Sequence, residues 1–153
     1  MTRLYLVQHG LAVDKAIDPD RPLSEQGRND VEKVGDFLQH AGISIDQLFN
    51  SGKTRAKQTA EILATSVGNP DVLALQGINP NDAVEPVANM VQNWVGDSMI
   101  VGHMPFVQKM VSQLLSSQDS LAIGFQPGSV VCLSYSEKTW TIDWMIRPHL
   151  LSS

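Results

Sequence analysis

The segment Leu-Tyr-Leu-Val-Gln-His-Gly at residues 4–10 decides how the rest of the chain is interpreted. Its first four residues form a short apolar run that is typical of a buried β-strand. The run is followed by Gln8, His9 and Gly10. Ligands of open α/β sheets bind beyond the carboxyl ends of the strands, so His9 lies where a functional side chain is expected. A histidine that only finishes a turn would give the same local pattern, and the rest of the chain has to separate the two interpretations.

The same pattern recurs at residues 98–105, Ser-Met-Ile-Val-Gly-His-Met-Pro. An apolar run again ends in a glycine and a histidine, Gly102 and His103. Pro105 suits the first turn of a following helix. Two strands that each deliver a histidine at the carboxyl end are hard to ascribe to chance, and the repetition favours a functional site.

Helical spacing of apolar residues predicts four helices. The first begins after Ser24, a suitable N-cap, and ends before Gly42, which suits the position after a C-cap. Asp82 and Glu85 match a capping box at the start of the third helix. The inward faces of the other three run from Ala56 to Val67, from Val84 to Val95 and from Val107 to Leu115.

Further apolar runs predict the remaining strands. These runs lie at residues 45–49, 72–75, 130–135 and 139–146, the last two joined by a turn at 136–138. Strands that alternate with helices are typical of α/β domains with parallel sheets, whereas the final pair is expected to form a hairpin. We therefore predict a single domain over residues 1–153, a three-layer α/β/α structure with a mainly parallel sheet.

The composition is that of an ordinary globular protein, with 42% hydrophobic and 18% charged residues. The net charge of −5 argues against nonspecific binding to nucleic acid or to an anionic membrane. The single cysteine, Cys132, cannot form an internal disulfide, which fits a cytoplasmic protein. It lies in an apolar run, and this favours a core residue over a nucleophile. No apolar run is long enough for a membrane span, and the first is too short for a signal peptide.

Arg55 suggests an anion near the start of the second predicted helix. It falls in the first turn, where a cation interacts unfavourably with the helix dipole. A helix N-terminus and an arginine attract the same kind of ligand, an anion, and a bound anion would remove the conflict.

These motifs together resemble the histidine phosphatase superfamily, also called the phosphoglycerate-mutase-like fold. Gln8-His9-Gly10 matches a strand that ends in Arg-His-Gly in the family. Ser51 and the segment Arg55–Ala60 match Ser-x-x-x-Arg-Ala-x-Gln-Thr-Ala, and Val101–Pro105 matches Val-Gly-His-x-Pro. The segment Arg21–Gly27, Arg-Pro-Leu-Ser-x-x-Gly, points to the small SixA-like phosphohistidine phosphatases.

The resemblance implies a phosphatase that uses no metal or other cofactor and acts on a phosphohistidine-containing protein. It assigns the nucleophile to His9, which would carry the phosphoryl group as phosphohistidine before water removes it. Arg55 offers a fork of donors that matches phosphate geometry, and His103 would bind phosphate oxygens and stabilise the transition state. Arg21 is a further candidate phosphate contact. Elsewhere in the chain no cluster has zinc-ligand spacing.

Two departures from the family pattern leave alternatives open. Gln8 replaces an arginine, and a glutamine can donate hydrogen bonds but cannot form a bidentate guanidinium clamp. Residues 76–80, where larger relatives carry an acidic residue, contain no carboxylate. A phosphohistidine needs little acid assistance because its leaving group is an imidazole, whereas an alkyl phosphoester needs more. The alternatives are a phosphate- or phosphoprotein-binding protein with little turnover and a phosphatase for small phosphoesters.

The interval between Arg55 and His103 is short compared with that of larger relatives. It has room for one helix, one short strand and turns. We therefore expect a shallow, open site that suits a histidine on another protein better than a small free metabolite.

Overall fold

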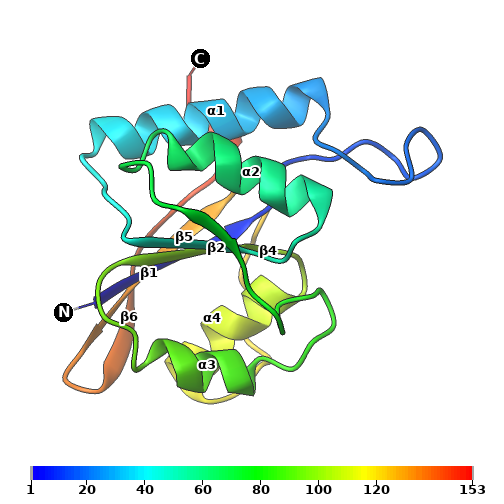
Figure 1. The fold of residues 1–153 in the computed structure, drawn as a ribbon. Coiled ribbons are helices and arrows are strands. Elements are labelled where there is room, and N and C mark those ends of the chain that lie inside the picture. Colours follow the sequence, from blue (N-terminus) through cyan, green and yellow to red (C-terminus); the bar gives the residue numbers. More distant parts are fainter. Residues whose placement is uncertain (1, 153) are drawn as a thin grey trace.

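The computed structural model describes residues 2–152, which form a six-stranded sheet between two pairs of helices (Figure 1). The strands are β1 (Thr2–Gln8), β2 (Gln47–Asn50), β3 (Val72–Ala74), β4 (Ser98–Gly102), β5 (Val130–Ser136) and β6 (Thr139–Ile146). The helices are α1 (Glu25–His40), α2 (Thr54–Ala64), α3 (Glu85–Val91) and α4 (Phe106–Ser116), with a 3-10 turn at Pro148–Leu150. Helices α1 and α2 cover one face of the sheet, and α3 and α4 cover the other.

The sheet has the order β3-β2-β4-β1-β5-β6. The first four strands are parallel, and β5 and β6 are antiparallel additions at one side. This confirms the predicted α/β architecture with a mainly parallel sheet. The turn between β5 and β6 places Glu137 and Lys138 at positive φ, as a tight hairpin turn requires.

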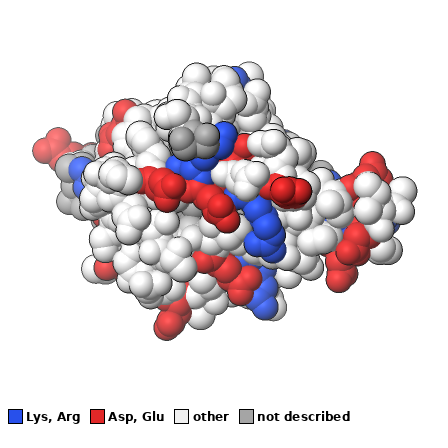
Figure 2. Space-filling model, turned by 90° about the horizontal axis from the view of Figure 1, so that it is seen from above, with Lys and Arg blue, Asp and Glu red and all other residues white. Residues whose placement is uncertain are grey.

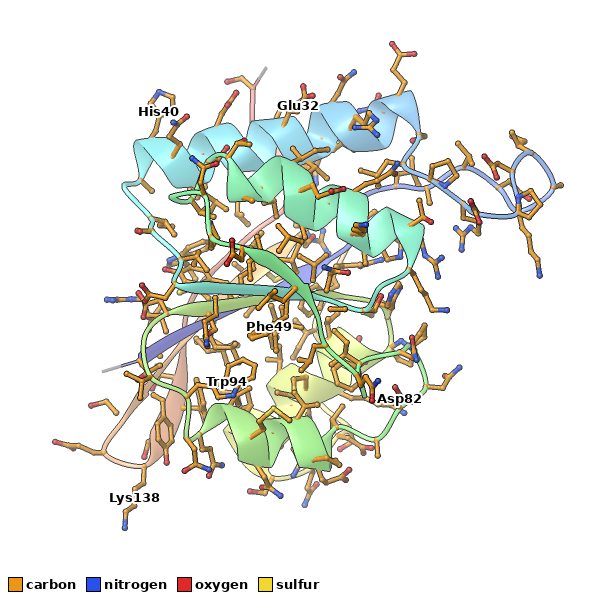
Figure 3. The ribbon with its side chains drawn as sticks, in the orientation of Figure 1. Glu32, His40, Phe49, Asp82, Trp94 and Lys138 are labelled. Atoms are coloured by element: carbon orange, nitrogen blue, oxygen red, sulfur yellow. The ribbon has the colours of Figure 1, made fainter. Side chains whose placement is uncertain are left out.

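Strand β1 is buried on both faces, which explains its unbroken apolar run. Leu4 and Leu6 pack in the core beneath α3 and α4, while Tyr5 and Val7 pack in the core beneath α1 and α2. On the α3 face, Phe49 of β2 and Trp94 lie with ring centroids 5.0 Å apart (Figure 3). Cys132 of β5 is fully buried, as predicted, and burial raises the pKa of its thiol to about 11.

The register of β1 and β4 determines where the two strand-end histidines lie. Gln8 is paired with Gly102, and the backbone N–H of His9 donates to the carbonyl of Gly102 at 3.0 Å. His9 and His103 therefore leave the sheet side by side, at the carboxyl edge of its two central parallel strands.

The predicted start and end of the third helix are wrong. Helix α3 has Val84 as its N-cap, and Asp82 instead closes the preceding turn by accepting the backbone N–H of Asn79 at 2.8 Å (Figure 3). The helix ends at Val91, and Val95, predicted to face inward, is 88% exposed. The turn uses the side chain that a capping box needs, so the helix begins later than the sequence pattern suggests.

Across residues 2–152 no helix combines the length and the apolar character that spanning a membrane requires.

Candidate functional site

A pocket of about 360 Å³ opens at the carboxyl ends of β1 and β4. All five residues predicted to form the site line it, although they come from separate parts of the chain. The lining consists of Gln8, His9, Leu11, Ala12, Arg21, Arg55, Pro80, His103, Met104 and Pro127. None of these residues is an aspartate or a glutamate, so the pocket lining contains no carboxylate.

The imidazole of His9 is held in one tautomer. Its Nδ1 lies 2.7 Å from the backbone carbonyl oxygen of Gly10. A carbonyl can only accept, so Nδ1 must carry the proton, and Nε2 of the neutral ring keeps a free lone pair. The ring lies beside that of His103, with centroids 4.9 Å apart.

His103 is held by a serine at the end of β2. Its Nε2 lies 2.6 Å from Oγ of Ser51, and the same oxygen accepts the backbone N–H of Lys53 at 3.3 Å. With that amide donating to it, the hydroxyl is free to donate its own proton to His103. This arrangement favours the tautomer of His103 with its proton on Nδ1. The side chain is only 1% exposed, and Nδ1 has no hydrogen-bond partner within residues 2–152.

Both histidines are neutral at pH 7. Burial, and then the charges of Arg55 and Arg21, lower the pKa of His9 to about 4, although the bond to Gly10 acts in the opposite direction. Burial and the neighbouring His9 and Arg55, followed by Lys53 and Arg21, lower the pKa of His103 to about 3. A neutral His9 is the form that can act as a nucleophile.

The two arginines of the pocket, Arg21 and Arg55, have no carboxylate partner among residues 2–152. In the described part of the chain, the ion pairs within 4.0 Å join Arg3 to Asp143 and Lys33 to Asp30. Arg55 is half-buried in the first turn of α2, and burial together with the charge of Arg21 lowers its pKa. Half-buried positive charge without a counterion is expected where an anion binds.

Buried polar atoms that lack a partner are concentrated in this pocket. Four such side-chain atoms occur among residues 2–152, and Gln8 Oε1, Arg55 Nε and His103 Nδ1 belong to pocket residues. The fourth is Nε1 of Trp140. Unsatisfied buried polar atoms are rare in folded proteins, and their shared location indicates a site that binds a polar ligand. Arg55 Nε is a donor and His103 Nδ1 is a donor in its favoured tautomer, so the pocket suits a ligand that accepts hydrogen bonds, such as an anion.

Two residues of the α2 motif hold the loops around the pocket, a role that the sequence analysis did not assign. The hydroxyl of Thr59 accepts the backbone N–H of Gly10 at 2.9 Å and donates to the carbonyl of Arg55 at 2.8 Å. The side-chain oxygen of Gln58 accepts the backbone N–H of Leu23 at 2.7 Å. Their positions three and four residues after Arg55 place them on the same side of the helix, which was the available signal.

The segment that carries Arg21 is held by close packing. A Cβ on Gly27 would lie 2.0 Å from the carbonyl oxygen of Leu11, so only glycine fits at this crossing. Ser24 caps α1, as predicted, by accepting the backbone N–H of Gly27 at 3.0 Å. Arg21 has a φ of 49°, and its Nε donates to the carbonyl of Val13 at 3.2 Å.

Within residues 2–152, the side chains of histidine, cysteine, aspartate and glutamate form no group of three suited to hold a metal ion.

Comparison with known proteins agrees with this geometry. The model of the histidine phosphatase superfamily (branch 1) matches residues 4–79. The chain is 28% identical over 137 residues to an uncharacterised protein of a Picosynechococcus strain, which covers 85% of this chain and 83% of that protein. It is 23% identical over 153 residues to the phosphohistidine phosphatase SixA of Escherichia coli, covering 95% and 94% of the two chains.

The fold is shared with solved structures. The protein histidine phosphatase SixA complexed with tungstate superposes with a TM-score of 0.85 and 22% sequence identity. The superposition covers 97% of this chain and 98% of the other. At this identity the likeness establishes the fold, and the chemistry has to be argued from the side chains of the pocket.

Proposed function

Since this chain belongs to the histidine phosphatase superfamily, we propose that it removes phosphate from phosphohistidine in other proteins, with His9 as the nucleophile. The observation that carries the proposal is the 2.7 Å contact between His9 Nδ1 and the Gly10 carbonyl. It leaves a free lone pair on Nε2 beside the unpartnered donors of Arg55 and His103.

In the first step, Nε2 of His9 attacks phosphorus and the bond from phosphorus to the substrate imidazole breaks. The electron pair of that bond stays on the substrate ring, which leaves as a neutral imidazole when its other nitrogen is protonated. His9 becomes an N-phosphorylated imidazolium. The Gly10 carbonyl keeps accepting its Nδ1 proton and so stabilises the positive charge on the ring.

In the second step, water attacks phosphorus and the bond to His9 Nε2 breaks. The electron pair returns to Nε2, the water proton leaves with phosphate or passes to solvent, and His9 is neutral again. In both steps we assign to Arg55, His103 and Arg21, which all line the pocket, the role of donating to the oxygens of the phosphoryl group, where charge is concentrated.

The lining of the pocket favours an imidazole leaving group over an alcohol. None of the lining residues carries a carboxylate that could protonate a departing alkoxide. Both steps of phosphohistidine hydrolysis release an imidazole, whose ordinary pKa of about 6.5 makes it a good leaving group without a dedicated acid. A small alkyl phosphoester is therefore the less favoured substrate.

The named relatives support this substrate class. The curated SixA of Escherichia coli is a phosphohistidine phosphatase, and the solved SixA holds tungstate, an oxyanion of the same shape and charge type as phosphate. The unpartnered donors of Arg55 and His103 support binding of a similar anion in this pocket. The proposed roles are nucleophile for His9 and phosphate contacts for Gln8, Arg21, Arg55 and His103.

Gln8 supports a second candidate, a phosphoprotein-binding protein with little turnover. Its Oε1 is a buried acceptor without a partner within residues 2–152, and an acceptor facing the anion would be repulsive. Rotation of the amide by 180° would instead present its NH2 group as a donor. Either way the residue supplies no charge at a position where relatives have an arginine.

The proposal is tested by incubating the protein with a phosphorylated histidine-phosphotransfer domain and following the loss of phosphate. A rapid quench without acid, followed by mass spectrometry, should locate a phosphoryl group on His9. The His9→Ala variant should lose both the label and the activity. Label on Ser51 or Cys132 would contradict the mechanism, and tight binding of the phosphoprotein without turnover would favour the second candidate.

A further inference from the structure

The loop between β1 and α1 projects from the body of the protein beside the pocket (Figure 1). We call residues 13–20 the projecting loop. Its base borders the catalytic pocket directly, since Ala12 on one side and Arg21 on the other both line it. Any macromolecule whose phosphoryl group reaches His9 must therefore pass close to this loop.

The projecting loop is well ordered by its own hydrogen bonds. At the base, Ala12 and Leu23 form an antiparallel bridge, and the N–H of Val13 donates to the carbonyl of Pro22 at 2.9 Å. Within the loop, the N–H groups of Ile17 and Asp18 donate to the carbonyl of Asp14 at 2.9 and 3.1 Å. These bonds define the backbone conformation of the loop, so less backbone entropy is lost when a partner binds to it.

The side chain at the tip of the loop is apolar and uncovered. Ile17 is 78% exposed, and the turns of the loop are held by backbone hydrogen bonds that do not involve its side chain. It therefore contributes nothing to the core that would explain an isoleucine at this place. A single exposed aliphatic side chain is common on protein surfaces, and Ile17 is of interest because the base of its loop lines the pocket.

The surroundings of Ile17 are acidic. Asp14, Asp18 and Asp20 lie in the loop with Lys15 as the one basic residue, and Figure 2 shows acidic side chains over the projecting part of the surface at its right edge. Asp14 and Asp18 each use one oxygen to accept a backbone N–H within the loop. The carboxylate of Asp20 belongs to an exposed residue and holds none of these turns.

We infer that the projecting loop is a docking element for the protein substrate. Ile17 contacts an apolar patch beside the phosphohistidine, and Asp20 with its acidic neighbours faces basic side chains of the same partner. This inference rests on the proposed function, because it takes the substrate to be a phosphohistidine on a protein. It adds that recognition depends on the partner's surface beyond the phosphohistidine itself.

The test compares one protein substrate and one small substrate. Initial rates are measured with a phosphorylated histidine-phosphotransfer domain and with free phosphohistidine, for the natural protein, Ile17→Ser and Asp20→Asn. Val95→Ser is the matched control, because Val95 is also strongly exposed but precedes β4, at the opposite edge of the sheet from the pocket. Thermal unfolding of each variant confirms that it folds.

We expect Ile17→Ser to raise KM for the phosphoprotein roughly tenfold, the effect of losing contact with most of one aliphatic side chain. Asp20→Asn should raise KM severalfold at low salt and less at high salt. Rates with free phosphohistidine should stay unchanged, and Val95→Ser should alter neither substrate. Equal losses on both substrates, or no change on the phosphoprotein, would overturn the docking inference.

A parallel binding measurement separates this inference from the proposed function. Affinity for the same phosphoprotein is measured in the His9→Ala background, with and without Ile17→Ser. A natural protein that shows no turnover with either substrate contradicts the proposed function. In that case the docking element is still supported if Ile17→Ser weakens binding of the phosphoprotein, and is rejected if binding is unaltered.

Discussion

The hydroxyl oxygen of Ser51 lies 2.6 Å from Nε2 of His103 and connects the end of β2 to the end of β4. The backbone N–H of Lys53 occupies one lone pair of that oxygen. Ser51 thus orients the imidazole of His103 and favours a proton on Nδ1, the atom left without a partner in the pocket. A positioning residue of this kind acts through His103 without touching the substrate.

Replacing Ser51 by alanine should weaken oxyanion binding and turnover together. Loss of one neutral hydrogen bond, at about 0.5–1.5 kcal/mol, corresponds to a decrease of roughly three- to tenfold. Nitrogen NMR of His103 should show its tautomer shifting away from Nδ1–H, a signal that general destabilisation would not produce. Ser51→Thr retains the hydroxyl and should recover most of the activity. An unchanged tautomer in Ser51→Ala would contradict the positioning role.

Chelating agents should leave the phosphatase activity unchanged. Arg21, Arg55 and His103 line the pocket, and in the proposed mechanism these side chains, rather than a cation, stabilise the charge on the phosphoryl oxygens. The measurement is the rate on phosphoprotein after dialysis against a chelator, compared with dialysis against buffer alone. Activity that is lost on chelation and restored by zinc or magnesium would assign the two histidines to a metal instead.

Stability should decrease as the pH is lowered through the acidic range. The folded protein holds the pKa of His9 at about 4 and that of His103 at about 3, whereas both are near 6.5 in the unfolded chain. Above about pH 6.5 both states are neutral at these sites, and the histidines do not affect the equilibrium. Below it the unfolded chain takes up protons that the folded protein excludes, so the free energy of unfolding falls until the folded pKa values are reached.

Urea unfolding at about pH 7.5 and at about pH 4.5 measures this dependence. The double variant His9→Gln/His103→Gln should lose less stability between the two conditions than the natural protein does. Inorganic phosphate should protect the natural protein, because an anion in the pocket stabilises the folded state. An identical pH dependence in the two proteins would show that the histidines are not the groups responsible.

The parts of the site that follow from local pattern could be predicted from the sequence. His9 and His103 end apolar runs, and parallel strands bring their carboxyl ends to one edge of the sheet. Arg55 stands in the first turn of α2, where an unpaired cation indicates an anion. These three positions follow from two apolar runs and one helix start, each of which is visible in the local sequence.

Contacts between segments distant in the sequence could not be predicted in the same way. The bond from the Gly10 amide to the Thr59 hydroxyl depends on how α2 packs against the loop after β1, and the bond between Ser51 and His103 depends on how the ends of β2 and β4 lie together. The start of α3 was misjudged for a related reason, because Asp82 is equally suited to cap a helix or to close a turn. Which of these local hydrogen bonds forms depends on the packing of the neighbouring chain.

The change Gln8→Arg is expected to raise kcat/KM on phosphohistidine. Gln8 lines the pocket together with His9, Arg55 and Arg21, and the proposed mechanism places the phosphoryl group among these residues. An arginine there would add a charged donor, and a hydrogen bond to a charged group contributes about 1.5–3 kcal/mol. If the whole interaction stabilises the transition state, kcat/KM should rise roughly tenfold to hundredfold. The gain is smaller to the extent that the side chain of Gln8 already donates a hydrogen bond to the phosphoryl group.

The same change should lower the stability of the protein when no anion is bound. The new guanidinium would lie near Arg55 and Arg21 in a pocket whose lining has no carboxylate to balance them. Inorganic phosphate should therefore stabilise Gln8→Arg against thermal unfolding more than it stabilises the natural protein.

Turnover of the natural protein and of Gln8→Arg is measured on one phosphohistidine substrate, with His9→Ala as the blank. Because His9, Arg55 and His103 are all in place, we expect the natural protein to turn over slowly but above the blank. A natural protein that equals the blank while binding the phosphoprotein tightly would make it a binding protein, and recovery of turnover by Gln8→Arg would then identify this one residue as the cause.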